Sequence, residues 1–206
     1  MKRHVYSMMV AAALIAVLAG TARAGDEFNR PGPYLGIGPS GGLTNFSGAF
    51  KGFGNSYGFN FHGGYRFNDY VAIEGLYEYM DDFGASRTSL NLQRKASASI
   101  QTNNFALAAK FIFPTMGISQ LQPFVSGGIG LLNANGSGKL TVRGTTVAED
   151  RRTPSTTEFA GRVDGGVDYF LTRNVSTFFD VGYVIPTGQL SDMPYLSLGA
   201  GLKYNF

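Results

Sequence analysis

The segment "LSLGAGLKYNF" at residues 196–206 decides the fold, because two kinds of residue alternate strictly along it. One set is apolar or aromatic, and the set between its members is small or polar. The apolar set is Leu196, Leu198, Ala200, Leu202, Tyr204 and Phe206. A period of two places the two sets on opposite faces of a β-strand. We therefore predict a final strand with one face in apolar surroundings.

The same alternation recurs along the chain. It is clear at 57–67, where Tyr57, Phe59 and Phe61 face away from Asn60 and His62. Further predicted strands are at 33–43, 70–80, 102–113, 122–132, 158–169 and 175–185. The alternation is weaker at 33–43 and 122–132, which are rich in glycine. With the last segment the sequence predicts about eight strands.

The first 24 residues have the features of a secretory signal peptide. Two basic residues precede an apolar run at 8–19, and Ala22 and Ala24 form a small-x-small cleavage site. The run of 12 residues is too short for a transmembrane helix, which needs about 20. We expect cleavage after Ala24 and one mature domain over 25–206.

Charge and composition then limit the class of protein. Residues 1–24 hold three of the 17 basic residues and no acidic residue, which leaves 14 of each sign. This balance gives no support for nucleic-acid binding. The absence of cysteine excludes a disulfide framework. No apolar run after the leader could form a membrane helix, and a closed β-barrel is the other structure that pairs every backbone group in lipid.

The connections between the predicted strands alternate in length. Those near 68–69, 114–120 and 171–174 are short, whereas those at 44–56, 81–101, 133–157 and 186–193 are mostly longer and polar. Short periplasmic turns and longer extracellular loops are typical of outer-membrane barrels. Aromatic residues near both strand ends predict two interfacial girdles. A soluble β-sandwich is the alternative. We predict an all-β fold, a single antiparallel up-and-down transmembrane barrel.

In these predicted strands the chain resembles the eight-stranded outer-membrane β-barrel proteins, a group that includes the transmembrane domain of outer membrane protein A and the opacity-type proteins. The segments that carry the resemblance are "YLGIG" (34–38), "GFNFHGGYRFNDYVAIEGLYEY" (58–79), "PFVSGGIG" (123–130) and "GAGLKYNF" (199–206). The resemblance implies that the barrel assembly machinery recognises Leu198, Ala200, Leu202, Tyr204 and Phe206 as a sorting strand. We further expect a monomer in the cell outer membrane, in contact with its lipids and lipopolysaccharide, with no cofactor.

The inward faces of the predicted strands carry ionisable residues. They are His62, Arg66, Glu74, Glu78, Lys110, Arg162, Asp164, Asp168, Asp180 and Lys203. An eight-stranded barrel is only wide enough for its own side chains, and an unpaired buried charge is costly. We therefore expect these groups to form ion pairs. A hairpin that turns at 67–69 would place His62 directly opposite Glu74, and Gly64 opposite Ala72. Loss of Glu74 is expected to destabilise the barrel and to raise its conductance.

Several functions fit such a lumen. The favoured one is a structural or surface role with a salt-bridged plug, and the alternative is a small porin or uptake channel. Uptake of hydrophobic molecules, as in proteins similar to outer membrane protein W, requires an apolar channel, whereas the inward face predicted here is charged. Neither a Ser/His/acid spacing nor a metal cluster appears in the sequence, so we expect no enzyme; lipid modification and adhesion are remote alternatives. The basic residues of 133–157 are expected to be solvated, or to contact lipopolysaccharide phosphates or a host surface.

Overall fold

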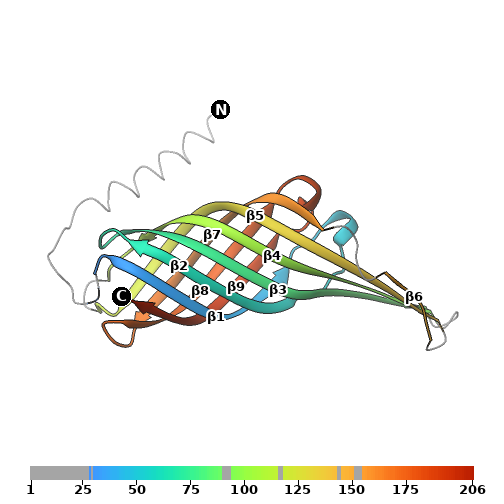
Figure 1. The fold of residues 1–206 in the computed structure, drawn as a ribbon, viewed down its shortest axis with the longest axis horizontal. Helices are drawn as coiled ribbons and strands as arrows, with labels where there is room; N and C mark the ends of the chain where they lie inside the picture. Colours follow the sequence, from blue (N-terminus) through green and yellow to red (C-terminus); the bar gives the residue numbers. More distant parts are fainter. Residues whose placement is uncertain (1–27, 29, 90–93, 116–117, 143–144, 151–154) are drawn as a thin grey trace.

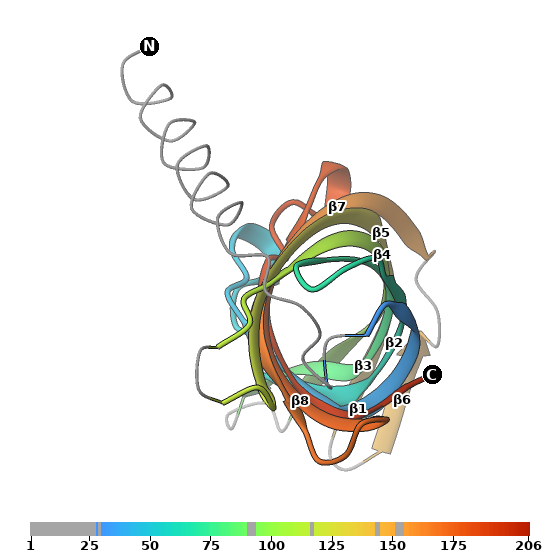
Figure 2. The same ribbon diagram turned by 90° about the vertical axis from the view of Figure 1, so that its left-hand side faces the viewer.

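The strands close into a barrel in the computed structural model of the chain, as Figures 1 and 2 show. The structure describes residues 28, 30–89, 94–115, 118–142, 145–150 and 155–206. The first strand, β1 (Gly32–Thr44), pairs with the last strand, β9 (Tyr195–Asn205), and this pairing closes the ring. The predicted leader and its cleavage site at Ala22 and Ala24 lie outside the described residues.

All neighbouring strands are antiparallel, and each pairs with the next barrel strand along the chain. The others are β2 (Ser56–Arg66), β3 (Val71–Ser89), β4 (Arg94–Ile112), β5 (Leu121–Val142), β7 (Thr156–Phe170) and β8 (Val175–Pro186). A ninth, short strand, β6 (Thr145–Asp150), pairs only with the end of β5 and lies outside the ring. The prediction of an all-β, eight-stranded barrel is confirmed. No helix among the described residues is long and apolar enough to span a bilayer.

The alternation of the sequence becomes the two faces of the barrel wall. In β1, Tyr34 and Ser40 are buried inside, whereas Leu35 and Ile37 are 46% and 60% exposed outside. Glycines at inward positions allow the wall to curve, because a Cβ on Gly38 would lie 1.9 Å from the carbonyl oxygen of Ala200. The outward face is therefore apolar, as contact with lipid tails requires.

Two of the predicted long loops are instead mostly strand. Three barrel strands, β3, β4 and β5, continue beyond the ring through segments predicted as the loops 81–101 and 133–157. They pair without interruption from Phe83 opposite Ile100 to Ser89 opposite Arg94, and β4 pairs with β5 as far as Val142. Together with β6 they form a projecting sheet, which tapers away from the barrel in Figure 1. The polar Ser- and Thr-rich composition suggested loops, but ladder hydrogen bonds and cross-strand pairs hold such residues in a sheet.

Two loops at the end of the barrel from which the projecting sheet extends each contain a single 3₁₀ turn. These turns are η1 (Gly48–Phe50), between β1 and β2, and η2 (Gly188–Leu190), between β8 and β9. The backbone amide of Ser47 donates to the carbonyl oxygen of Asp192, so these two neighbouring loops are joined at the barrel mouth. The start of β1 and the C-terminal residue, Phe206, lie at the opposite end, with the short turns.

Candidate functional site

The interior of the barrel is the candidate site, because it holds all of the predicted ionisable residues. None of them is more than 8% exposed. Each lies at an inward position of its strand, between outward apolar neighbours. Most of them form two layers of ion pairs along the barrel axis, whereas Arg66, at the end with the short turns, and Asp180 belong to neither layer.

The lower layer is centred on Asp168 of β7. Lys110 and Lys203 reach it from β4 and β9, with Nζ–Oδ distances of 2.7 and 2.9 Å. Both ammonium groups also lie within 4 Å of Glu74 Oε2, at 3.8 and 3.9 Å. The Lys110 ammonium lies 3.6 Å from the centre of the Phe124 ring, which adds a cation–π contact. Two cations therefore share two carboxylates from different strands.

Glu74 also links this layer to two further hydrogen-bonding groups. The Tyr34 hydroxyl donates to Glu74 Oε2 at 2.7 Å, and His62 Nδ1 lies 3.0 Å from Oε1. His62 and Glu74 are therefore in contact, although the predicted pairing that led to this expectation is wrong. Glu74 pairs with Gly64, and His62 pairs with Leu76.

The turn between β2 and β3 explains this difference in register. Its centre lies at Asp69, one residue further along the chain than predicted, where the Asn68 side chain accepts hydrogen bonds from the backbone amides of Tyr70 and Val71, both at 2.9 Å. The ladder consequently begins with Arg66 opposite Ala72. A shift of two residues keeps every side chain on its face, so His62 and Glu74 remain inside and meet diagonally.

The upper layer surrounds Arg162 of β7. Its Nε donates to Asp164 Oδ1 at 2.7 Å, and its Nη1 lies 3.2 Å from Glu78 Oε2. Glu78 also accepts hydrogen bonds from the hydroxyl groups of Tyr195, at 2.8 Å, and Ser197. This layer therefore ties β3 and β9 to β7 across the lumen.

Other buried polar atoms have no hydrogen-bond partner among the described residues. They include both side-chain polar atoms of Asn60 and Asn104 and both carboxylate oxygens of Asp180. Asp180 does not join the lower layer, and the ionisable group within 4 Å of it is His62 Nε2, at 3.9 Å. Because these atoms include both donors and acceptors, they have the chemistry that ordered internal water satisfies.

Arg66 closes the end of the lumen beside the short turns. Its guanidinium group donates to Gln122 Oε1 at 2.8 Å and to the backbone carbonyls of Asn68 and Asp69, at 3.0 and 2.8 Å. It therefore fixes the mouth of the barrel instead of joining the two layers. Phe28 packs nearby against Phe170, with 5.6 Å between ring centres.

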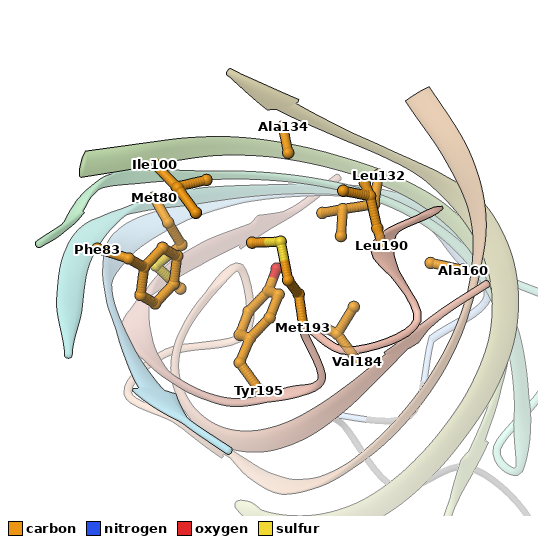
Figure 3. Close-up of a cluster of buried hydrophobic side chains, with 10 residues drawn as sticks. All are labelled: Met80, Phe83, Ile100, Leu132, Ala134, Ala160, Val184, Leu190, Met193 and Tyr195. Atoms are coloured by element: carbon orange, nitrogen blue, oxygen red, sulfur yellow. The ribbon is translucent and has the colours of Figure 1, made fainter. Parts of the chain in front are cut away.

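The opposite end of the lumen is filled by apolar side chains that sequence analysis missed. Figure 3 shows this apolar cluster, whose members point toward one another from several strands and from the η2 loop. It comprises Met80, Phe83, Ile100, Leu132, Ala134, Ala160, Val184, Leu190, Met193 and Tyr195. Phe46, Phe50 and Phe53 of the first loop pack against it. The expectation of a uniformly charged inward face is therefore wrong for this end.

One irregularity in the sheet made the apolar cluster hard to recognise. The β3–β4 register shifts between Met80 and Phe83, so residues separated by three positions both point inward. A β-bulge of this kind breaks the period of two. One indication of the apolar cluster was present in the sequence, since inward positions 80, 132 and 184 are all apolar.

The outward face of the last strand is exposed as its alternation predicts. Leu202, Tyr204 and Phe206 are 55%, 48% and 63% exposed, and Ala200 is also exposed. Leu198 lies on the same face but is half-buried. Among the described residues no group of His, Cys, Asp and Glu could hold a metal ion.

These features together define a transmembrane β-barrel with a closed ring, an apolar wall and a charged interior. The sequence profile of the outer membrane protein beta-barrel domain family matches residues 10–206, and the chain belongs to this family. It is accordingly a protein of the cell outer membrane.

Solved structures share the fold at low sequence identity. Neisserial surface protein A is 16% identical with a TM-score of 0.56, over 84% of this chain and 97% of that one. The attachment invasion locus protein Ail of Yersinia pestis is 16% identical with a TM-score of 0.55, over 86% and 100%. OprG of Pseudomonas aeruginosa is 13% identical with a TM-score of 0.59, over 88% and 99%. No curated protein sequence matches the chain significantly.

Proposed function

We propose that the protein is a structural, surface-exposed barrel of the outer membrane whose lumen is closed to solutes. The observation that carries this proposal is that side chains from many strands fill successive levels of the lumen. Two layers of ion pairs occupy the lumen, and the apolar cluster fills the end beyond them. Passage of a hydrated ion would require at least three of these levels to rearrange together.

The energetic cost supports closure over gating. Separating Arg162 from Glu78 and Asp164 would leave buried charges unpaired, which costs about 3–5 kcal/mol when one partner of such a pair is removed. The lower layer presents a similar cost at Asp168. A small porin, the alternative function, needs a continuous hydrated path, whereas the ion pairs and the apolar cluster fill the described interior.

Uptake of hydrophobic molecules is a weaker alternative, although the upper lumen is apolar. Met80, Phe83, Leu132 and Val184 are 0% exposed, so the apolar cluster acts as a cap instead of a passage. An apolar solute would have to displace the η1 and η2 loops, and it would then meet the charged upper layer.

Planar-bilayer recording tests the proposal. The wild-type barrel is expected to give no ohmic steps in molar salt. A triple variant that empties one side chain at each of the three levels, Lys110→Ala with Arg162→Ala and Phe83→Ala, is expected to conduct ions. The control, Lys51→Ala with Arg30→Ala, removes the same charge from exposed positions outside the layers and should remain closed. Salt-dependent steps from the wild type would identify a small porin and overturn the proposal.

A second candidate function rests on the projecting sheet. The projecting sheet lies on the side of the long connections, which in such barrels is extracellular. Arg94, Lys95 and Lys139 lie on paired strands of this sheet, and the similar Ail has been solved with a heparin analogue. We propose that the sheet contacts a polyanion, such as the phosphates of lipopolysaccharide. Replacing these three residues with Gln should weaken retention on immobilised lipopolysaccharide, and unchanged retention would exclude this role.

A further inference from the structure

The lumen holds one carboxylate, that of Asp180 on β8, which belongs to neither layer of ion pairs. The residue is 2% exposed, and both of its carboxylate oxygens lack a hydrogen-bond partner among the described residues. No lysine or arginine nitrogen of the described chain lies within 4 Å of them, and the ionisable group that does is His62, at 3.9 Å. A buried charge without a partner is costly, so this carboxylate requires a positive or hydrogen-donating group beside it.

The orientation of His62 does not supply that group. Its Nδ1 lies 3.0 Å from Oε1 of Glu74, a carboxylate that also pairs with the ammonium groups of Lys110 and Lys203. An ionised carboxylate only accepts hydrogen bonds, so the proton of the neutral imidazole is on Nδ1. Nε2, which has no hydrogen-bond partner among the described residues, then turns its lone pair toward Asp180 Oδ2. Two acceptors therefore face each other across 3.9 Å.

A third polar side chain reaches the same place from β2. Asn60 is 0% exposed, and neither its amide oxygen nor its amide nitrogen has a hydrogen-bond partner among the described residues. Asn60 Nδ2 and Asp180 Oδ1 each lie 2.5 Å from the point that a Cβ on Gly199 would occupy, so the two side chains converge over this glycine. Turning the amide about its last torsion presents its oxygen there instead.

Glycines keep other side chains away from this pair. Asn60 pairs with Gly38 of β1, and Asp180 pairs with Gly166 of β7 and with Gly199 of β9. A Cβ on Gly38 or Gly166 would lie 1.9 or 2.4 Å from a backbone carbonyl oxygen, so these two positions do not accept a larger residue. The polar groups of β2 and β8 can consequently approach each other across β1 and β9.

We propose that Asp180, Asn60 and His62 bind one monovalent cation of the size of sodium inside the lumen. They offer a carboxylate oxygen, an amide oxygen and a ring nitrogen, all of which are electron-pair donors. Small hard cations take oxygen ligands at short range, about 2.3–2.6 Å for Ca²⁺, and Asn60 and Asp180 already converge within 2.5 Å of one point.

The charge of the site favours a monovalent ion over a divalent one. One carboxylate balances one positive charge, whereas Ca²⁺ takes about 6–8 oxygen ligands, several of them from carboxylates. No three His, Cys, Asp or Glu side chains of the described residues come together as a metal site. The ion would be enclosed as the barrel folds and would link β2 to β8, which neither layer of ion pairs does. The site does not depend on whether the lumen conducts, so it stands apart from the proposed function.

Sodium-dependent stability tests the site. Barrels are refolded in vesicles and unfolded in urea, in sodium chloride or in choline chloride at the same ionic strength. A ligand that binds only the folded state lowers the equilibrium constant of unfolding, about tenfold when its concentration is ten times its Kd. We expect sodium to have this effect and choline, which is too large for the filled interior, to have none. Equal stability in the two salts would overturn the proposal.

A pair of variants locates the effect. Asp180→Asn removes the charge at nearly constant volume and should abolish the difference between the two salts. The matched control, Asp82→Asn, removes the same charge from an exposed position of β3 and should keep the difference. Sodium dependence that persists in Asp180→Asn would contradict the assignment. If this variant does not form a heat-modifiable barrel, Asn60→Ala replaces it and should reduce the sodium dependence.

The linewidth of the sodium NMR signal provides a readout that does not involve unfolding. Wild-type barrel in detergent micelles should broaden the signal, and Asp180→Asn should not. Potassium that stabilises the wild type as sodium does supports the same site. Stabilisation that follows pH but not sodium would identify a proton between His62 and Asp180, and stabilisation by Mn²⁺ in place of sodium would identify a divalent ion; either result would overturn the proposal.

Discussion

Removal of the Glu74 carboxylate should destabilise the barrel more than any single exposed charge. Glu74 is 5% exposed, and its two oxygens serve four neighbours. Tyr34 and His62 form hydrogen bonds to it at 2.7 and 3.0 Å, and the two lysines of the lower layer lie further away. The variant Glu74→Ala leaves all four without this acceptor.

The distances indicate which of these losses dominates. Lys110 and Lys203 keep Asp168 at 2.7 and 2.9 Å, so their ion pairs largely survive. Tyr34 loses the acceptor of its hydroxyl inside the lumen, and His62 Nδ1 loses its partner. Hydrogen bonds to charged groups contribute about 1.5–3 kcal/mol each, so the loss of two gives about 3–6 kcal/mol. This sum agrees with the cost of about 3–5 kcal/mol for removing one member of a buried ion pair.

Urea titration of protein refolded in vesicles measures this loss. Far-ultraviolet circular dichroism reports the sheet, and the folded and unfolded bands on unboiled gels give an independent fraction folded. Glu74→Gln keeps an acceptor for Tyr34 and is expected to cost less than Glu74→Ala. Asp82→Ala, at an exposed position of β3, is the control and should change the free energy of unfolding by less than about 0.5 kcal/mol.

Conductance separates the role of Glu74 from closure of the barrel. The sequence suggested that loss of Glu74 would raise conductance, but the upper layer around Arg162 and the apolar cluster do not involve this residue. We therefore expect Glu74→Ala to be less stable and still closed. A Glu74→Ala barrel within about 0.5 kcal/mol of the wild type, the range of ordinary surface substitutions, would refute the network argument.

Three further outcomes are expected. Because a closed barrel has no edge strand, unboiled protein should migrate on detergent gels separately from boiled protein; identical migration would argue against a closed barrel. Val181→Arg, on the membrane face of β8, should cost about 2–4 kcal/mol in a refolding series if it lies near the bilayer midplane. Arg at Ser176, which is 1% exposed inside, should be limited by packing space, and equal costs would contradict the assigned faces. Deleting Phe206 should reduce the outer-membrane yield far more than Asn205→Ala does; equal yields would exclude a sorting role for Phe206.

The sequence predicted the barrel because its evidence is a short-range pattern. Alternation along 196–206 or 57–67 needs only local sequence to be recognised, and it fixes which side chains share a face. The inward placement of the ionisable residues follows from the same parity. The ends of the long strands β3, β4 and β5 were harder to predict, because Ser- and Thr-rich segments beyond position 81 resemble loops until their cross-strand partners are known.

The sequence could not supply the register between strands. Arg162 pairs with Asp164 of its own strand and with Glu78 of β3, and Glu78 accepts a hydrogen bond from Tyr195 of β9. No periodicity links these positions. The length of a single turn decides them, as at Asn68, where two side-chain hydrogen bonds to backbone amides moved the β2–β3 pairing by two residues. Such a shift preserves the face and changes the partner. The alternation of inward and outward positions therefore determines which residues fill a barrel of this size. Turn chemistry and β-bulges determine which of these residues meet, and only these contacts decide whether the lumen opens.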